Sequence, residues 1–245
     1  MQKNNKKYML KKKTAKYLQE EFNDVSQNQN SFLPKKIHIE YKNEKQKLFA
    51  DTIDKNEITL CIGSAGTGKS LISIYKALEL VLDKNNKYEK LFIVTPLVEA
   101  EESIGYLKGF LQEKMQPYLY SIYYLIDKLI GKSARLKMVE LGIIEPLALT
   151  FCRGVNLSDC VMLSDESQNF SLKAIVLLLS RISYNAKFII SGDISQVDNF
   201  KNPEECGLNI AIEKLKDVEN IGIVKFERSD IVRNPIVGKI LDKLN

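Results

Sequence analysis

The sequence predicts an α/β fold in which a mostly parallel β-sheet is flanked by helices. Short apolar runs alternate with longer segments of helical spacing along the 245-residue chain. A glycine-rich octet, Gly63 to Ser70, joins one apolar run to one helical segment. Two adjacent acids, Asp165 and Glu166, directly follow another apolar run, at the position where parallel sheets bind their ligands. With 44% hydrophobic residues, the chain can bury one substantial core.

The expected elements follow from this alternation in chain order. An apolar run ending in Leu60-Cys61-Ile62 predicts a strand before the octet, and residues 71–82 predict the helix after it. Further apolar runs lie at 90–95, 147–151, 161–163 and 188–191, and helical patterns at 98–130 and 172–182. Because strands and helices take turns in this way, a sheet of mainly parallel strands is expected.

The octet reads Gly63-Ser64-Ala65-Gly66-Thr67-Gly68-Lys69-Ser70 and fits the phosphate-binding pattern G-x-x-x-x-G-K-[ST]. Its glycines lack the Cβ that would keep backbone N–H groups away from phosphate oxygens. The helix that follows adds the partial positive charge of its N-terminus. Lys69 is expected to meet the β- and γ-phosphates, and the hydroxyl of Ser70 to bind Mg²⁺. A plain glycine-rich turn is the alternative, which the strand and helix on either side make less favoured.

The acid pair lies in Ser164-Asp165-Glu166-Ser167-Gln168-Asn169. Asp165 is expected to hold Mg²⁺, directly or through water, and Glu166 to orient or polarise the water that attacks the γ-phosphate. Adjacent acids after a strand also occur as turns or helix caps. Their position about a hundred residues after a phosphate-binding loop favours the catalytic interpretation.

Two further residues are candidates for the same site. Gln196, in the segment Ser191 to Gln196, follows an apolar run and can report the γ-phosphate by hydrogen bonding; a simple Gly-Asp turn is the equal alternative. Arg233 can stabilise transition-state charge as an arginine finger, whereas the competing account is a surface arginine at a helix end.

Composition narrows the protein class. The four cysteines are far apart and include no C-x-x-C pair, which favours reduced thiols in a cytoplasmic protein over disulfides or a zinc ribbon. No run approaches the roughly 18 apolar residues of a membrane span, so a soluble protein without a membrane partner is expected. Residues 1–16 carry seven lysines and no acid, and removing them from the net charge of +5 leaves −2. Residues 1–35 are therefore interpreted as a basic, polar tail and linker, and residues 36–245 as the folded domain.

Taken together, these residues resemble the PhoH-like family of P-loop ATPases, which is related in its motif set to superfamily 1 helicases. The resemblance covers most of the chain. The matching positions are Gln46, the octet, Pro96 to Ala100, Ile104 to Leu107, Glu113 to Tyr118, Arg153-Gly154, Asp165 to Asn169, Gly192 to Asp198, Gly207-Leu208 and Asp230 to Pro235.

The resemblance implies a RecA-like core that uses ATP and Mg²⁺, and a ring in which a neighbouring subunit completes the site. It also implies that Gln46 reads adenine. Two arginines of the family pattern are absent from this chain. Thr95, in Val94-Thr95-Pro96, occupies the position of one, and Val155, two residues after Arg153, occupies the position of the other. Arg153 and Arg233 are therefore expected to take over the part of the missing arginines, in the site of their own chain or in that of a neighbouring subunit.

The leading functional hypothesis is an ATPase, hexameric as the family resemblance implies, that couples hydrolysis to remodelling of RNA or a ribonucleoprotein. The octet is then the nucleotide site, and Lys69, Glu166, Gln196, Arg233 and Arg153 act in catalysis. A second hypothesis is a nucleotide-responsive binding module that switches a partner. A small-molecule kinase is a third. The tyrosines within 118–124 can stack on nucleic-acid bases, although core or subunit-interface packing is the commoner use of such spacing.

Overall fold

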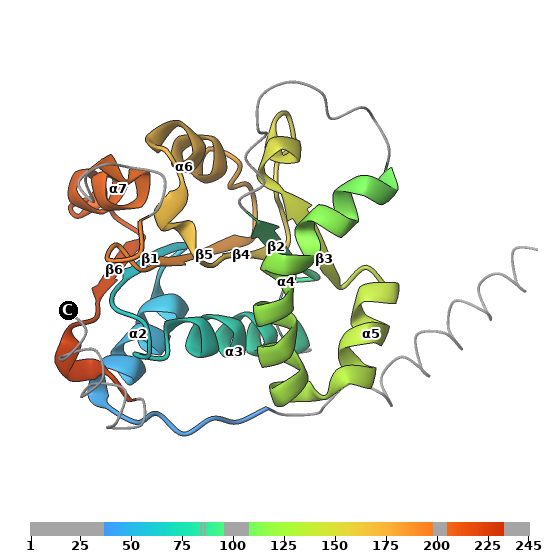
Figure 1. Ribbon diagram of the computed structural model, residues 1–245, viewed down its shortest axis with the longest axis horizontal. Coiled ribbons are helices and arrows are strands. Elements are labelled where there is room, and N and C mark those ends of the chain that lie inside the picture. The colour runs from blue at the N-terminus through green and yellow to red at the C-terminus, as the bar shows by residue number, and fades with distance from the viewer. Residues whose placement is uncertain (1–36, 84, 86, 96–107, 198–204, 233–245) are drawn as a thin grey trace, which may run out of the picture. The chain divides into compact units, whose positions relative to one another are not determined.

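A computed structural model of the chain describes residues 37–83, 85, 87–95, 108–197 and 205–232 (Figure 1). Six strands form one sheet in the order β3-β2-β4-β5-β1-β6, and every pairing is parallel. The strands are β1 (Ile58–Ile62), β2 (Lys90–Thr95), β3 (Ile144–Ala148), β4 (Cys160–Ser164), β5 (Ala186–Gly192) and β6 (Ile221–Lys225). The predicted α/β class with a parallel sheet is confirmed.

Helices cover both faces of this sheet. The helices are α2 (Glu44–Lys55), α3 (Lys69–Leu82), α4 (Lys108–Ile130), α5 (Lys132–Glu140), α6 (Leu172–Leu179) and α7 (Gly207–Leu215). In Figure 1, α2 and α3 lie on one face of the sheet and α6 and α7 on the other, while α4 and α5 lie toward β2 and β3. No helix in the described part of the chain has both the length and the apolar composition to cross a bilayer.

The burial of the strands explains why their sequences are apolar runs. Every residue of β1, β4 and β5 is buried, because helices pack on both faces of these central strands. Phe188 in β5 and Phe170, just before α6, are fully buried in the core beneath α6 and α7. The central strands were therefore visible in the sequence as continuous hydrophobic segments.

The edge strand β3 corrects the expectation for 147–151. The strand spans Ile144–Ala148, and Leu149–Cys152 forms a 3-10 helix, η1. Glu145 and Pro146 interrupt the apolar pattern at the start of the strand. Proline has no N–H to donate, and it is tolerated here because β3 is an edge strand that pairs only with β2, so its other side forms no hydrogen bonds to a described strand.

Two expected helices differ in extent. The helix expected at 172–182 ends at Leu179, because Ile182 leaves the helix to form a parallel bridge with Leu157. Its start is set by Ser171, whose side chain accepts a hydrogen bond from the N–H of Ala174. The helix expected at 98–130 is α4 over 108–130, and its first ten residues lie outside the described part, as does the tail at 1–35.

The strand order brings three loops to one edge of the sheet. β5 lies between β1 and β4, with Ile62 opposite Gly192 and Ser164 opposite Ile190. Since all three strands run in parallel, their carboxyl ends meet at the same edge. The glycine-rich octet, the acid pair and the segment that carries Gln196 therefore converge.

Candidate nucleotide-binding site

The octet forms a tight loop between β1 and α3 whose glycines are required by space and by conformation. Gly66 and Gly68 have φ angles of 90° and 93°, in the region that L side chains rarely adopt. A Cβ on Gly68 would lie 2.7 Å from Nε2 of Gln46, and one on Gly63 would lie 2.4 Å from Cβ of Phe226. Neither Gly63 nor Gly68 therefore has room for a side chain.

Lys69 is held within this loop. Its side chain is buried, at 7% exposure, and Nζ donates hydrogen bonds to the carbonyl oxygens of Gly63 at 2.5 Å and Ser64 at 3.0 Å. The hydroxyl of Thr67 also donates to the Ser64 carbonyl at 3.0 Å. Lys69 is the first residue of α3, so its charge adds to the positive N-terminal end of that helix. The loop concentrates positive potential and backbone donors in one place, which fits a polyphosphate.

Gln46 supports the loop by a hydrogen bond from the neighbouring helix α2. It lies on α2, and its Nε2 donates to the Thr67 carbonyl at 2.8 Å, while its Oε1 accepts from the Lys42 N–H at 2.8 Å. The helix is fixed by Asn43, whose side chain accepts from the Gln46 N–H. One of the two amide protons of Gln46 already supports the loop. Adenine recognition by the other stays a prediction.

Asp165 and Glu166 extend from the carboxyl end of β4. Asp165 is 8% exposed and accepts a hydrogen bond from the hydroxyl of Ser191, on β5, at 2.6 Å. Mg²⁺ takes only one or two carboxylates from a protein and fills its remaining positions with phosphate oxygens and water. A single buried carboxylate at Asp165, with the half-buried hydroxyl of Ser70 in the loop, therefore fits such an ion.

Glu166 has an unusual backbone and a perturbed carboxyl group. Its φ and ψ of 54° and 37° are left-handed, a conformation that costs a non-glycine residue free energy and that clusters at functional sites. Its Oε2 accepts a hydrogen bond from Nε2 of Gln168 at 2.8 Å. Loss of solvent around the carboxyl raises the pKa of Glu166, and repulsion from Asp165 adds to this, while the Gln168 hydrogen bond lowers it. A raised pKa makes the carboxylate a stronger base.

A chain of hydrogen bonds joins Glu166 to Gln196. Gln168 is 3% exposed, and its Oε1 accepts from the Asp193 N–H at 3.1 Å. Oδ2 of Asp193 in turn accepts from Nε2 of Gln196 at 2.9 Å. A Cβ on Gly192 would lie 2.9 Å from the Gln168 backbone nitrogen, so this crossing of the two loops requires glycine. The structure thus links the acid pair of β4 to the loop after β5.

The same edge also receives the C-terminal segment. The Gly63 N–H donates to the Gly192 carbonyl at 3.3 Å, which ties the octet to β5. The Val232 N–H donates to the Gly66 carbonyl at 3.0 Å. Arg233 follows directly and lies outside the described residues, so its role stays a prediction.

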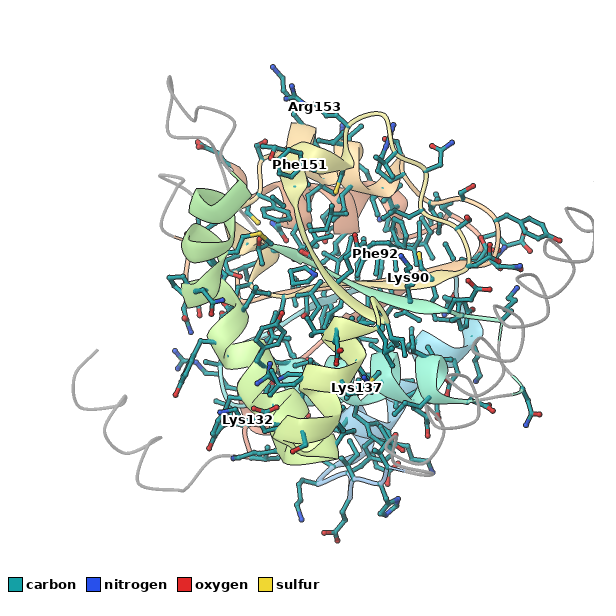
Figure 2. The ribbon with its side chains drawn as sticks, turned by 90° about the vertical axis from the view of Figure 1, so that its right-hand side faces the viewer. Lys90, Phe92, Lys132, Lys137, Phe151 and Arg153 are labelled. Carbon is teal, nitrogen blue, oxygen red and sulfur yellow. The ribbon has the colours of Figure 1, made fainter. Side chains whose placement is uncertain are left out.

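Arg153 is not brought to the octet of its own chain. It lies exposed just after η1, at the carboxyl end of β3. Figure 2 shows it with Phe151 at the end of the molecule opposite Lys132 and Lys137. Four strand spacings of about 4.8 Å separate β3 from β1, or about 19 Å in all.

Three residues of the network were not singled out from the sequence. These are Gln168, Ser191 and Asp193, and each lies within a motif that was recognised. Their neighbours in the chain marked the segments, but each makes its contact across two strands that are far apart in the sequence. Only the pairing of β4 with β5 in the sheet brings them together.

Comparisons with known proteins identify the family of this chain. The sequence model of the PhoH-like protein family matches residues 38–245. The chain belongs to the PhoH-like protein family. A PhoH-like protein of Bacillus subtilis is 35% identical over 204 residues, covering 83% of this chain and 63% of the relative. Protein PhoH of Escherichia coli K12 is 30% identical over 202 residues, covering 82% and 56%. The chain therefore spans about three-fifths of the length of the PhoH-like proteins it matches.

A solved structure supports the fold of this PhoH-like chain. The large terminase of a thermophilic bacteriophage superimposes with a TM-score of 0.50 over 82% of this chain and 50% of that one. Identity is 11%, so the likeness concerns the fold alone. The all-parallel sheet, with the glycine-rich loop between β1 and α3, has the RecA-like P-loop fold that the sequence predicts.

Proposed function

We propose that this PhoH-like chain binds ATP with Mg²⁺ and hydrolyses it. The observation that carries the proposal is the hydrogen-bonded chain from Gln196 through Asp193 and Gln168 to Glu166, beside the phosphate-binding loop. A loop that only binds nucleotide has no need of a base held in this way. A carboxylate with a raised pKa at the edge of the sheet suits activation of an attacking water.

Each residue has a distinct part in this proposal. The octet and the N-terminus of α3 bind the phosphates, and Lys69 contacts the β- and γ-phosphates. Ser70 and Asp165 would hold Mg²⁺, which would supply positive charge to the phosphate oxygens. Glu166 orients the attacking water. Gln196 hydrogen-bonds the γ-phosphate, and its contact with Asp193 links it to Gln168 and Glu166.

Two substitutions test these roles. Glu166→Gln is expected to bind ATP as the parent does and to hydrolyse it 10²- to 10⁴-fold more slowly, roughly the contribution of a general base. Lys69→Ala is expected to lose ATP affinity. Lys137→Ala, which breaks an exposed ion pair with Glu140, is the matched control and should keep parental turnover. Parental turnover in Glu166→Gln would contradict the proposal.

We further propose that single-stranded RNA is a partner. Tyr118, Tyr120 and Tyr124 of α4 are exposed, with Tyr120 at 74%, and Nζ of Lys128 lies 4.5 Å from the ring centroid of Tyr124. Exposed rings next to a cation suit base stacking and backbone contact. Turnover should rise with RNA at low salt and lose that rise at high salt. Tyr120→Ala should reduce the stimulation and leave basal turnover unchanged.

A ring, with six subunits as the family resemblance implies, is the assembly we propose. Its support is the position of Arg153, which is exposed and remote from its own octet and so is available to the site of a neighbouring copy. Mass measurement with ATP present tests the assembly. Mixing Arg153→Ala with Lys69→Ala tests the trans role, since mixed rings should then recover turnover that neither variant has alone.

The alternative is a nucleotide-responsive module that switches a partner without work on nucleic acid. It uses the same phosphate contacts, so basal turnover does not distinguish it. Absence of RNA stimulation of the parent chain at low salt favours the module.

A further inference from the structure

A pocket lies beside the acid pair, on the side away from the octet. It is about 180 Å³ in volume and lies between the carboxyl ends of β2 and β4 and the helix α4. Thr95, Asp165 and Glu166 line it from the sheet, and Ser121 and Ile122 line it from α4. A pocket of this size has room for ordered water.

Thr95, which lines this pocket, has a hydroxyl group without a described hydrogen-bond partner. It is the last residue of β2 and is 1% exposed, and its Oγ1 has no hydrogen-bond partner among the described residues. Ile93 is opposite Leu163 in the β2–β4 pairing, so Thr95 lies level with Asp165 on the neighbouring strand. Buried hydroxyl groups almost always have a partner, either protein or ordered water. The pocket is where such a partner fits.

The chemistry of the lining selects the occupant. The carboxyl groups of Asp165 and Glu166 make one side of the pocket acidic, which disfavours a free anion as its occupant. Ser121 already donates its hydroxyl to the Tyr118 carbonyl, at 3.4 Å. Water suits the remaining groups, because it can donate one proton to Glu166 and the other to Thr95 Oγ1.

We propose that Thr95 is a further catalytic residue, whose hydroxyl and the Glu166 carboxylate together hold the attacking water. The inference rests on the proposed ATPase function. The water oxygen forms the new bond to the γ-phosphorus, and the bond from that phosphorus to the β,γ-bridging oxygen breaks. One water proton passes to Glu166, and ADP and inorganic phosphate are the products. Thr95 accepts a hydrogen bond from the other proton and so directs the oxygen lone pair toward phosphorus.

Three variants test the assignment. Thr95→Val replaces the hydroxyl by a methyl of similar size, and we expect kcat to fall at least 10-fold while the ATP Kd stays within about threefold. Thr95→Ser keeps the hydroxyl and should stay within about threefold of the parent in kcat. Thr59→Val is the matched control, because Thr59 is also a fully buried strand threonine, hydrogen-bonded to the Thr52 carbonyl away from the site. It should leave kcat unchanged.

Glu166→Gln distinguishes a failure of the Thr95 assignment from a failure of the ATPase proposal. If Glu166→Gln is inactive and Thr95→Val turns over as the parent does, the Thr95 assignment is wrong and the ATPase proposal stands. If Glu166→Gln retains parental turnover, the ATPase proposal itself is wrong. If Thr95→Val lowers only the stimulation by RNA, the pocket serves nucleic acid and the assignment is overturned. Thr95→Ala carries the same expectation as Thr95→Val should the valine variant not fold.

Discussion

Replacing Gln168 by methionine removes the hydrogen bonds that join the acid pair to the loop after β5. Methionine has nearly the same length and volume, so packing is retained while both polar contacts are lost. The lost contacts are the donation from Nε2 to Glu166 Oε2 at 2.8 Å and the donation from the Asp193 N–H to Oε1 at 3.1 Å. Gln168 acts through its neighbours, so it is a positioning residue.

The size of the effect follows from these two contacts. The Asp193 N–H is buried and loses its acceptor, which costs about 1 to 3 kcal/mol of unfolding free energy. The Gln168 hydrogen bond lowers the pKa of Glu166, so its removal raises that pKa further. Because water activation requires the carboxylate, the acidic limb of the kcat profile is expected to move to higher pH. With the Glu166 side chain no longer held, kcat at its maximum should fall about 10- to 100-fold.

The assays are steady-state ATP turnover from pH 5 to 9, ATP affinity and denaturant unfolding. Gln168→Glu is the matched variant, because it can keep the acceptor for the Asp193 N–H and loses only the donor to Glu166. It should show the larger pH displacement, because it places a further negative charge beside Glu166. An unchanged acidic limb in both variants would refute the positioning role.

Three other predictions follow from single contacts. Gly68→Ala should weaken ATP binding at least 10-fold by fluorescence titration, since its Cβ meets Gln46 in a left-handed loop, whereas Gly142→Ala, with a φ of 67° and nothing within 4 Å, should not affect affinity. Lys187→Met should cost about 2 to 4 kcal/mol in denaturant unfolding, because the buried ammonium hydrogen-bonds carbonyls at the end of α2 that would lose their donor. Glu166→Gln should change how stability depends on pH. The folded parent holds the Glu166 proton to higher pH than the unfolded chain does, so the unfolding free energy of the parent falls as pH rises above the ordinary glutamate pKa. The variant should lack this fall in urea titrations at pH 4 to 8.

The fold was predictable where burial on both faces left a continuous apolar run. β2 has the bounds that the sequence predicted, and β4 and β5 extend the predicted runs by one or two residues at each end. The edge strands were less visible. β3 carries Glu145 and Pro146 directly after its first residue, and β6 alternates in burial, so neither presents an unbroken apolar segment.

The sequence by itself determined the chemical groups of this site. The octet from Gly63 to Ser70 and the pair Asp165-Glu166 are local patterns, and residue type with spacing is enough to recognise them. Because these motifs are local, they say nothing about contacts with distant parts of the chain. A motif shows that a carboxylate follows a strand, but not which side chain from another strand will hold it.

Only the tertiary structure decided which groups meet. Placing β5 between β1 and β4 brings Ser191 to Asp165 and Gln168 to Asp193, while placing β3 at the far edge takes Arg153 away from the octet. These contacts join residues about 25 apart in the chain across neighbouring strands, and strand order depends on the packing of the whole sheet. The unsatisfied hydroxyl of Thr95 became apparent for the same reason, since β2 beside β4 places it next to the acid pair.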